Sequence, residues 1–233
     1  MLEEITTIQP YLTLLPDNEA VFAPKSAFLA KHLLPLISID LSVVNPKWQG
    51  KIHLINPIEP YECYIGSETT EFADEFANEN WFILQLNDEN QYEWLGNPNY
   101  FQLENPDCDE ELKQHSQEMH QDYLELKARF KETGKIITRC QLKYPDDDPV
   151  ILLEQLGGEV SRSNWHTPIN EYFNVTHINE KTDEEIEIHD YQGRRYYFVA
   201  SVPGWRYCIH GADDILIFYQ PETKRVLFTF DWT

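Results

Sequence analysis

The sequence predicts an α+β fold: a predominantly antiparallel sheet, one long helix near 106–133 and a C-terminal β-hairpin. Three observations lead to this fold class. Short segments rich in β-branched and aromatic residues follow one another in runs, one long segment has helical periodicity, and a turn separates the last two apolar segments. Runs of strands with few helices between them are typical of antiparallel sheets. We therefore treat residues 1–233 as one α+β domain, with a subdivision near residue 134 as the alternative.

The long helix is the clearest local prediction. Asn105 is a good N-cap, Pro106 suits the first helical position, and Gly134 can end the helix. Acidic residues gather in its first turns and basic residues in its last turns, where each opposes the helix dipole. Two shorter helices are expected after Pro24 and Ser67. The apolar stripe that the long helix should bury consists of Leu112, Met119, Tyr123, Leu126 and Phe130.

Most of the other periodic segments are predicted to be strands. In chain order they are LISIDLSVV, KIHLI, WFILQL, KIITRCQL, VILLEQL, YYFVASV, DILIFY and RVLFTF. The last two are joined by QPETK, in which Pro221 favours a turn, so they should form the C-terminal hairpin. Its largest apolar side chains should face a core, because runs this apolar do not stay exposed. They are Leu216, Phe218, Leu227 and Phe230.

Composition favours a folded cytoplasmic protein. The chain has 233 residues, of which 42% are hydrophobic and 13% aromatic, enough to bury a substantial core. No apolar run approaches the roughly 20 residues that cross a bilayer. The N-terminal MLEEITTIQPYL has no basic n-region, so we expect no cleaved signal peptide. The cysteines form no CxxC pair and are expected to be reduced thiols; they are Cys63, Cys108, Cys140 and Cys208.

The distribution of charge is the most informative property of the sequence. Forty acidic residues against 18 basic ones give a net charge of −22. From Ile52 to Leu112 there is no Lys or Arg, whereas 15 Asp and Glu fall in that span together with many aromatic residues. Such a field repels phosphates, so we expect no binding to nucleic acid or to an anionic membrane. It would attract a basic protein, unless the acidity serves solubility alone.

The first functional hypothesis follows from this span. It is a non-catalytic acidic protein-binding protein, most concretely an immunity protein that neutralises a basic toxin. Carboxylates would pair with Lys and Arg of the partner while aromatic side chains anchor the contact. The candidate partner-binding residues are Trp81, Glu89, Tyr92, Glu93 and Trp94. A related hypothesis is a polyanion mimic that occupies a nucleic-acid-binding protein and therefore competes with DNA.

A cluster of reactive residue types lies near the C-terminus, in the segment GWRYCIHGADDILIFY. If this segment is a strand, Cys208 and His210 share one of its faces. They could then be neighbours, which a nucleophile and its base must be. However, Asp213 and Asp214 would oppose thiolate formation, and a metal site would need a second pair of ligands at suitable spacing. The favoured interpretation is the rim of a sheet, with a turn at Gly211. We expect no catalytic residue, no metal and no cofactor.

A second functional hypothesis is a small-molecule-binding or hydrolytic domain that uses the Gly157-Gly158 pair and the Cys208/His210 region. The two glycines follow an apolar strand in LLEQLGGEVSRSNWHTP but match neither GxGxxG nor a P-loop. The hypothesis requires a pocket that brings this pair toward His210, and a separation above about 10 Å would remove its basis. The candidate pocket residues are Arg162, Trp165, His166, Arg206, Cys208 and His210.

Short motifs in the last third of the chain resemble the YwqG-like family of bacterial uncharacterised proteins. They are QLGGE followed by NW, the segment GADDILIFY and the ending FTFDWT, and the resemblance covers mainly residues 150–233. It implies an α+β fold without established catalytic residues. Similar bacterial proteins are sometimes found as immunity partners of secreted toxins, so the resemblance implies the same class of function as the charge does.

Overall fold

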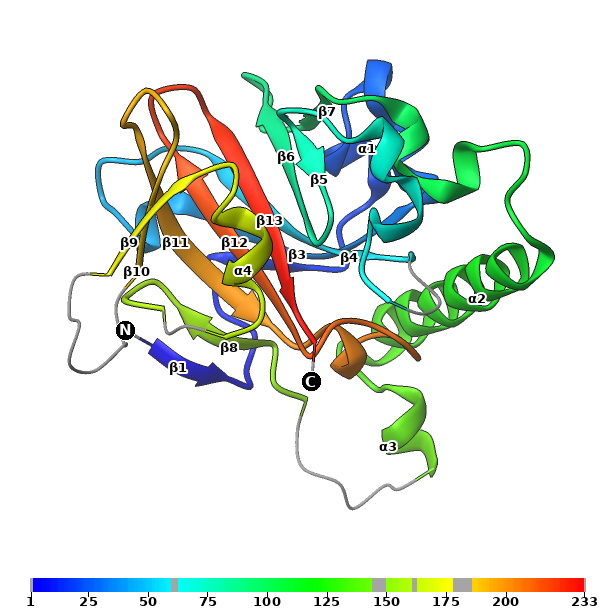
Figure 1. Ribbon diagram of the computed structural model, residues 1–233. Helices are drawn as coiled ribbons and strands as arrows, with labels where there is room; N and C mark the ends of the chain where they lie inside the picture. Colours follow the sequence, from blue (N-terminus) through cyan, green and yellow to red (C-terminus); the bar gives the residue numbers. More distant parts are fainter. Residues whose placement is uncertain (1, 60–62, 144–149, 161–162, 178–185, 233) are drawn as a thin grey trace.

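The computed structural model describes residues 2–59, 63–143, 150–160, 163–177 and 186–232 (Figure 1). In these residues the strands form a ten-stranded and a three-stranded sheet, and every strand pairing is antiparallel. The fold is therefore α+β, as the sequence predicts. The order of the larger sheet is β1 (Leu2–Ile5), β8 (Leu153–Leu156), β11 (Arg195–Val202), β12 (Asp214–Gln220), β13 (Arg225–Asp231), β6 (Trp81–Leu86) and β5 (Ala77–Asn78).

Three further strands extend the larger sheet beyond this path. They are β7 (Tyr92–Trp94) beside β6, β10 (Ile186–His189) beside β11, and β9 (Asn174–His177) beside β10. Because β13 pairs with β6, this sheet takes strands from both sides of Gly134. The hairpin of β12 and β13 is confirmed, with seven residue pairs in register from Asp214 and Asp231 to Gln220 and Arg225.

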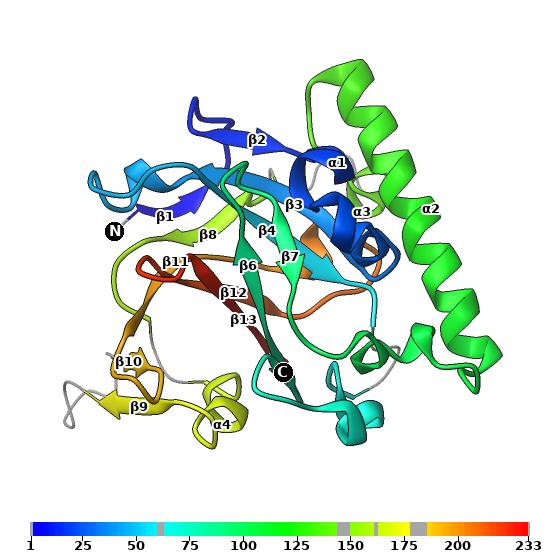
Figure 2. The same cartoon turned by 90° about the horizontal axis from the view of Figure 1, so that it is seen from above.

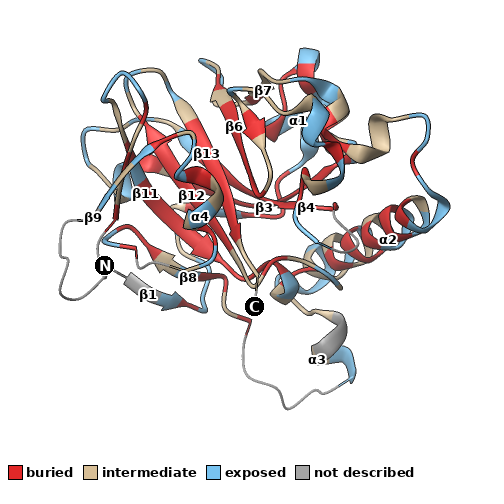
Figure 3. Cartoon of the chain, in the orientation of Figure 1, coloured by how far each residue is buried: buried red, intermediate tan, exposed pale blue. Residues whose placement is uncertain are grey.

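The main core lies between the two sheets. The smaller sheet consists of β2 (Leu12–Leu14), β3 (Leu33–Asp40) and β4 (Lys51–Pro57), in that order. Its apolar side chains share one buried cluster with Ile215, Ile217 and Phe230 of the C-terminal hairpin. Figure 3 shows both sheets as largely buried ribbons. Alternation along each strand sends one set of side chains into this layer and the other set to the opposite face.

A second core covers the opposite face of the larger sheet. It contains Leu216, Phe218 and Leu227 from the hairpin, together with Trp81 of β6. The short helix α4 (His166–Ile169) and strands β9 and β10 cover it (Figure 1). The four hairpin residues expected in a core are thus buried, although they are divided between the two faces.

The long helix is α2 (Glu110–Thr133), which runs along the smaller sheet (Figure 2). Its N-cap is Asp109, whose carboxylate accepts from the amide of Leu112 at 2.7 Å, so the prediction of Asn105 as N-cap is wrong. The Asn105 amide instead donates to the carbonyl of Asn99 at 3.0 Å. Gly134 ends the helix in the left-handed region at φ 68°, as predicted. Of the predicted stripe, four residues are buried and Phe130 is half-buried.

The remaining helices are short. They are α1 (Asn18–Val21), the 3-10 segments η1 (Pro24–Lys31), η2 (Leu41–Val43), η3 (Ser67–Phe72), η4 (Pro98–Tyr100), η5 (Gln102–Glu104) and η6 (Gly204–Arg206), and α3 (Arg139–Lys143).

The strand predicted for KIITRCQL is wrong, because α3 occupies its second half. Thr138 and Gln141 form a reciprocal capping box that starts this helix: the Thr138 amide donates to the Gln141 side chain at 3.1 Å, and the Gln141 amide donates to the Thr138 hydroxyl at 3.4 Å.

Candidate functional site

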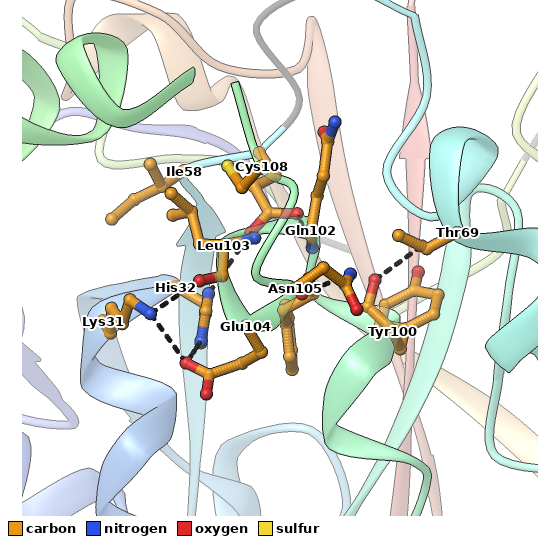
Figure 4. A network of polar contacts seen from close by, with 12 residues as sticks. Lys31, His32, Ile58, Thr69, Tyr100, Gln102, Leu103, Glu104, Asn105 and Cys108 are labelled. Carbon is orange, nitrogen blue, oxygen red and sulfur yellow. Dashed lines mark hydrogen bonds and ion pairs between the residues drawn. The ribbon is translucent and has the colours of Figure 1, made fainter. Parts of the chain in front are cut away.

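A buried network of polar contacts connects three separate segments of the chain (Figure 4). At its centre is His32, which lies between η1 and β3 and whose side chain is fully buried. Its Nδ1 lies 3.3 Å from Oε1 of Glu59, and its Nε2 lies 2.9 Å from Oε1 of Glu104. Both contacts are within hydrogen-bonding distance, and a ring nitrogen donates to a carboxylate only when it carries a proton. The ring also stacks on Phe101, with centroids 4.3 Å apart.

The two carboxylates of this network have different roles. Glu59 is buried and accepts from the backbone amides of Gln102 at 2.7 Å and Leu103 at 3.1 Å. Glu104 is half-buried and also accepts from the ammonium of Lys31 at 2.9 Å. Partial burial acts to raise the pKa of Glu104, but the hydrogen bonds from Lys31 and His32 outweigh it and hold that pKa below its usual value. We call Lys31, His32, Glu59 and Glu104 the His32 network.

The network supports one wall of a pocket of about 400 Å³ between η3 and the segment 99–108. We call it the acidic pocket; it is lined by Glu68, Thr69, Glu71, Phe72, Asn99, Gln102, Asn105, Pro106, Asp107 and Cys108. Three of these residues are exposed carboxylates, three are amides, and none of these ten is basic. The nearby cations Lys31 and Lys113 are each paired with a carboxylate, at 2.9 Å and 2.7 Å.

Hydrogen bonds fix the walls of the acidic pocket. The Thr69 hydroxyl donates to the carbonyl of Tyr100 at 2.7 Å, which ties η3 to the segment 99–108 (Figure 4). Behind this wall, the buried carboxylate of Glu59 accepts a hydrogen bond from the backbone amide of Gln102. Exposed carboxylates on such a wall can pair with an ammonium or a guanidinium, and the ring of Phe72 can contact the aliphatic part of such a side chain. The pocket therefore suits a cationic group.

The five residues predicted to bind a partner do not form one surface. Trp81 and Tyr92 are completely buried, in the second and the main core respectively, so their rings are not available to a partner. Trp94 is half-buried, with its ring 4.8 Å from that of Phe101. Glu93 pairs with Lys25 at 2.8 Å, and Glu89 is exposed.

The residues of the alternative pocket are also separated. Arg162 lies outside the described residues. Trp165 packs on Phe218 in the second core, whereas Cys208 belongs to the main core, so the larger sheet separates them. The other members are similarly divided: His166 contacts the carbonyl of Ser163, Arg206 lies 4.3 Å from the Trp205 ring centroid, and His210 is exposed beside His115.

The environment of Cys208 opposes nucleophilic chemistry. Burial raises the pKa of its thiol well above the usual value, and the nearby carboxylate of Asp122 raises it further. A hydrogen bond with Asn56 acts in the opposite direction but is the smaller effect. The segment around Cys208 is not a strand: it follows η6, and the Cys208 amide donates to the carbonyl of Gly204 at 3.2 Å. Only the thiolate is a good nucleophile, and these surroundings keep the thiol of Cys208 protonated. They therefore suit a structural cysteine and not a reactive one.

Among the residues that the structure describes, no three His, Cys, Asp or Glu side chains are arranged to hold a metal ion. In the same residues no helix combines the length and apolar character needed to cross a bilayer. Comparison of the chain with family models, with curated proteins and with solved structures gave no match in any of the three.

Proposed function

We propose that this chain is a non-catalytic acidic protein that binds and neutralises a basic protein partner. Its most concrete form is a cytoplasmic immunity protein for a basic toxin. The observation that carries the proposal is the acidic pocket, which presents Glu68, Glu71 and Asp107 around a hollow of about 400 Å³ with no basic side chain among its described lining. A lysine or arginine of the partner would enter this pocket and pair with the three carboxylates.

Two properties of the molecule support this role. The net charge of −22 attracts a basic protein over a distance and raises its association rate, an effect that salt weakens. In addition, the pocket wall is held by contacts internal to the chain, since Glu59 already binds the amides of Gln102 and Leu103. A partner would therefore not have to order this segment, and less of the interaction energy would be lost on binding.

The test separates the pocket from the general negative charge. A pocket variant carries Glu68→Gln, Glu71→Gln and Asp107→Asn. The matched control carries Glu19→Gln, Glu132→Gln and Glu159→Gln, which neutralise exposed residues outside the acidic pocket. Both triple variants change the net charge equally. The probe is a fluorescent peptide of sequence Gly-Arg-Lys-Arg-Gly, titrated with each protein at low and at physiological salt.

We expect the pocket variant to weaken peptide binding roughly tenfold, because three partly exposed ion pairs at up to ~1 kcal/mol each are lost. The control should weaken it less than about threefold, since only the long-range field changes. Equal effects in the two variants would show that net charge alone attracts the peptide. Absence of measurable binding by the unmodified protein at low salt would remove the proposal itself.

A further inference from the structure

A second and larger pocket, of about 720 Å³, lies where the loop after β1 meets the segment that follows α2. It is lined by Thr6, Thr7, Ile8, Leu14, Gly134, Lys135, Ile136, Ile137, Gln141, Val150 and Leu152. Leu14, Val150 and Leu152 are buried, whereas Ile8 is 51% exposed. We call it the apolar pocket, because six of its lining residues are aliphatic.

The space in this pocket is open enough to hold a ligand. Gly134 is exposed, and a Cβ atom built on it would meet no other atom within 4 Å, so this end of the pocket lining faces open space. Its volume falls within the roughly 300–1,000 Å³ of ordinary small-molecule sites, which are mostly apolar with a few polar groups. The polar groups available here are the hydroxyls of Thr6 and Thr7, the amide of Gln141 and the ammonium of Lys135.

One of the segments that line the apolar pocket is basic, in contrast to the whole chain. Residues 127–143 contain six of the 18 Lys and Arg, and Glu132 is the single acidic residue among them. Lys127 of this segment pairs with Asp17 at 2.9 Å. Lys135, in contrast, forms no ion pair with any residue that the structure describes. A cation at the edge of an apolar pocket in a chain of net charge −22 is suited to an anionic group of a ligand.

We propose that the apolar pocket binds a single-chain carboxylate of the fatty-acid class. The methylene chain would lie against the aliphatic side chains, and the carboxylate would pair with Lys135. The Thr7 hydroxyl accepts from the Gln9 amide at 3.0 Å, so its own proton can be donated to the second carboxylate oxygen. A neutral apolar molecule would leave Lys135 without an anion, and a cationic one would be repelled by it. This proposal involves neither the acidic pocket nor a protein partner.

The first experiment uses calorimetric titration of the full chain with sodium octanoate, decanoate and dodecanoate, each below its micelle concentration. Burial of one methylene strengthens binding about fourfold, so two added carbons should tighten it roughly 16-fold. Dodecyltrimethylammonium is the charge-reversed probe. The net charge of the chain would favour this cation, whereas the apolar pocket should bind it at least about tenfold more weakly than dodecanoate. Equal or tighter binding of the cation, or no binding of dodecanoate, would overturn the proposal.

The second experiment places the ligand in this pocket. Lys135→Glu should weaken dodecanoate binding about tenfold or more. Its matched control is Lys131→Glu, which makes the same charge change in the last turn of α2 but outside the pocket lining. Ile8→Trp should fill the pocket mouth and remove most of the binding, whereas Val43→Trp makes a similar change at another exposed apolar residue. If either control variant loses as much affinity as its partner variant, dodecanoate binds elsewhere. All four variants are compared by urea unfolding, so that a folding defect is recognised.

Discussion

Two polar groups, each built around buried side chains, lie at the same end of β4, and they are stabilised in different ways. The His32 network joins the His32 ring and the Lys31 ammonium to two carboxylates through contacts of hydrogen-bonding length. The second group, which we call the Cys208 cluster, consists of Asn56, Asp122, Cys208 and His210. There the buried Oδ1 of Asn56 has no hydrogen-bond partner among the described residues. Helix α2 lies beside both groups. The ring of His115 contacts the carbonyl of Ile58, the residue before Glu59, at 2.9 Å, and Asp122 of the Cys208 cluster accepts from the amide of Ile209 at 3.0 Å.

The difference shows how the two groups tolerate burial. A buried carboxylate such as Glu59 needs a cation and hydrogen-bond donors, which must come from distant parts of the chain. The amide of Asn56 carries no net charge, so its buried oxygen can lack a hydrogen bond at a smaller cost, about 1–3 kcal/mol. A Cβ atom on Gly204 would lie 2.4 Å from Asn56 Oδ1, and one on Gly211 would lie 2.7 Å from it. Both positions therefore require glycine for lack of space.

The largest effect is expected in the His32 network. Glu59→Gln replaces one carboxylate oxygen by an NH₂ group that cannot accept, so His32 or a backbone amide of η5 loses its acceptor. Breaking a buried charged pair costs about 3–5 kcal/mol. We expect a loss of that size in the free energy of unfolding, measured with urea. Glu104→Gln is the control: its side chain is half-buried and keeps one oxygen that can accept from His32 and Lys31, so it should lose about 1 kcal/mol or less. Equal losses would contradict the assignment of Glu59 as the anchor of the network.

An intermediate effect is expected from packing in the Cys208 cluster. Gly204→Ala forces its new methyl group against Asn56 Oδ1 and should cost roughly 1–3 kcal/mol. Asn56→Ala removes that oxygen. If the clash is the cause, the double variant should be clearly more stable than the sum of the two single losses predicts, as measured by a double-mutant cycle in urea. Strict additivity would show that Gly204 is needed for another reason.

The fold was predictable where its signals are local. The stripe of α2 and the β12–β13 hairpin are both encoded by short-range periodicity, and both are confirmed. The errors arose where two local signals compete. Ile136 and Ile137 indicated a strand, but the capping box of Thr138 and Gln141 starts α3 directly after them. Asn105 and Asp109 are both good N-caps, and the helix begins after the second one.

The site was predictable only in its charge. The ten residues that line the acidic pocket all lie in the span without Lys or Arg, although none of the five predicted partner-binding residues is among them. The His32 network was missed because its members are 27 and 72 residues apart, a separation that no local pattern reveals. Trp81 and Tyr92 were chosen for an interface although they lie in the core, because large aromatic rings suit both places equally well.

Asp214 forms no ion pair with any residue that the structure describes, and it provides a pH-dependent test of how buried carboxyl groups are stabilised. Asp214 is at the start of β12, directly opposite Asp231. Burial, reinforced by the charge of Glu154, raises the pKa of Asp214 to about 8. The folded state then keeps a proton that the unfolded state loses near pH 4, so stability falls as the pH rises from about 4 through 8. Asp214→Asn should therefore increase the free energy of unfolding at pH 8, by roughly 1–3 kcal/mol, and change it little at pH 4.

The control for Asp214 is a buried carboxylate that has a cation. Burial acts to raise the pKa of Asp190, but hydrogen bonds from Arg194 outweigh it and lower that pKa below its usual value. The stability from this pair is present above the ordinary pKa of an aspartate and is lost as the pH falls through the lowered value. Asp190→Asn should therefore destabilise the protein at pH 8, opposite in sign to Asp214→Asn. The same sign for both variants would contradict the dependence of buried carboxylates on a neighbouring cation.

The smallest effect is expected at Cys208 itself. Its thiol is buried beside Asp122, and burial raises its pKa well above the usual range, so it should remain protonated and unreactive at pH 8. In a variant whose other three cysteines are replaced by serine, a thiol reagent should label Cys208 only after urea is added. A variant that keeps Cys63 alone should react at once, because Cys63 is exposed. Cys208→Ala should stay folded, with a loss of about 1 kcal/mol and unchanged binding of the basic peptide. Rapid labelling of native Cys208, or loss of peptide binding in a folded Cys208→Ala variant, would instead make this thiol a functional group.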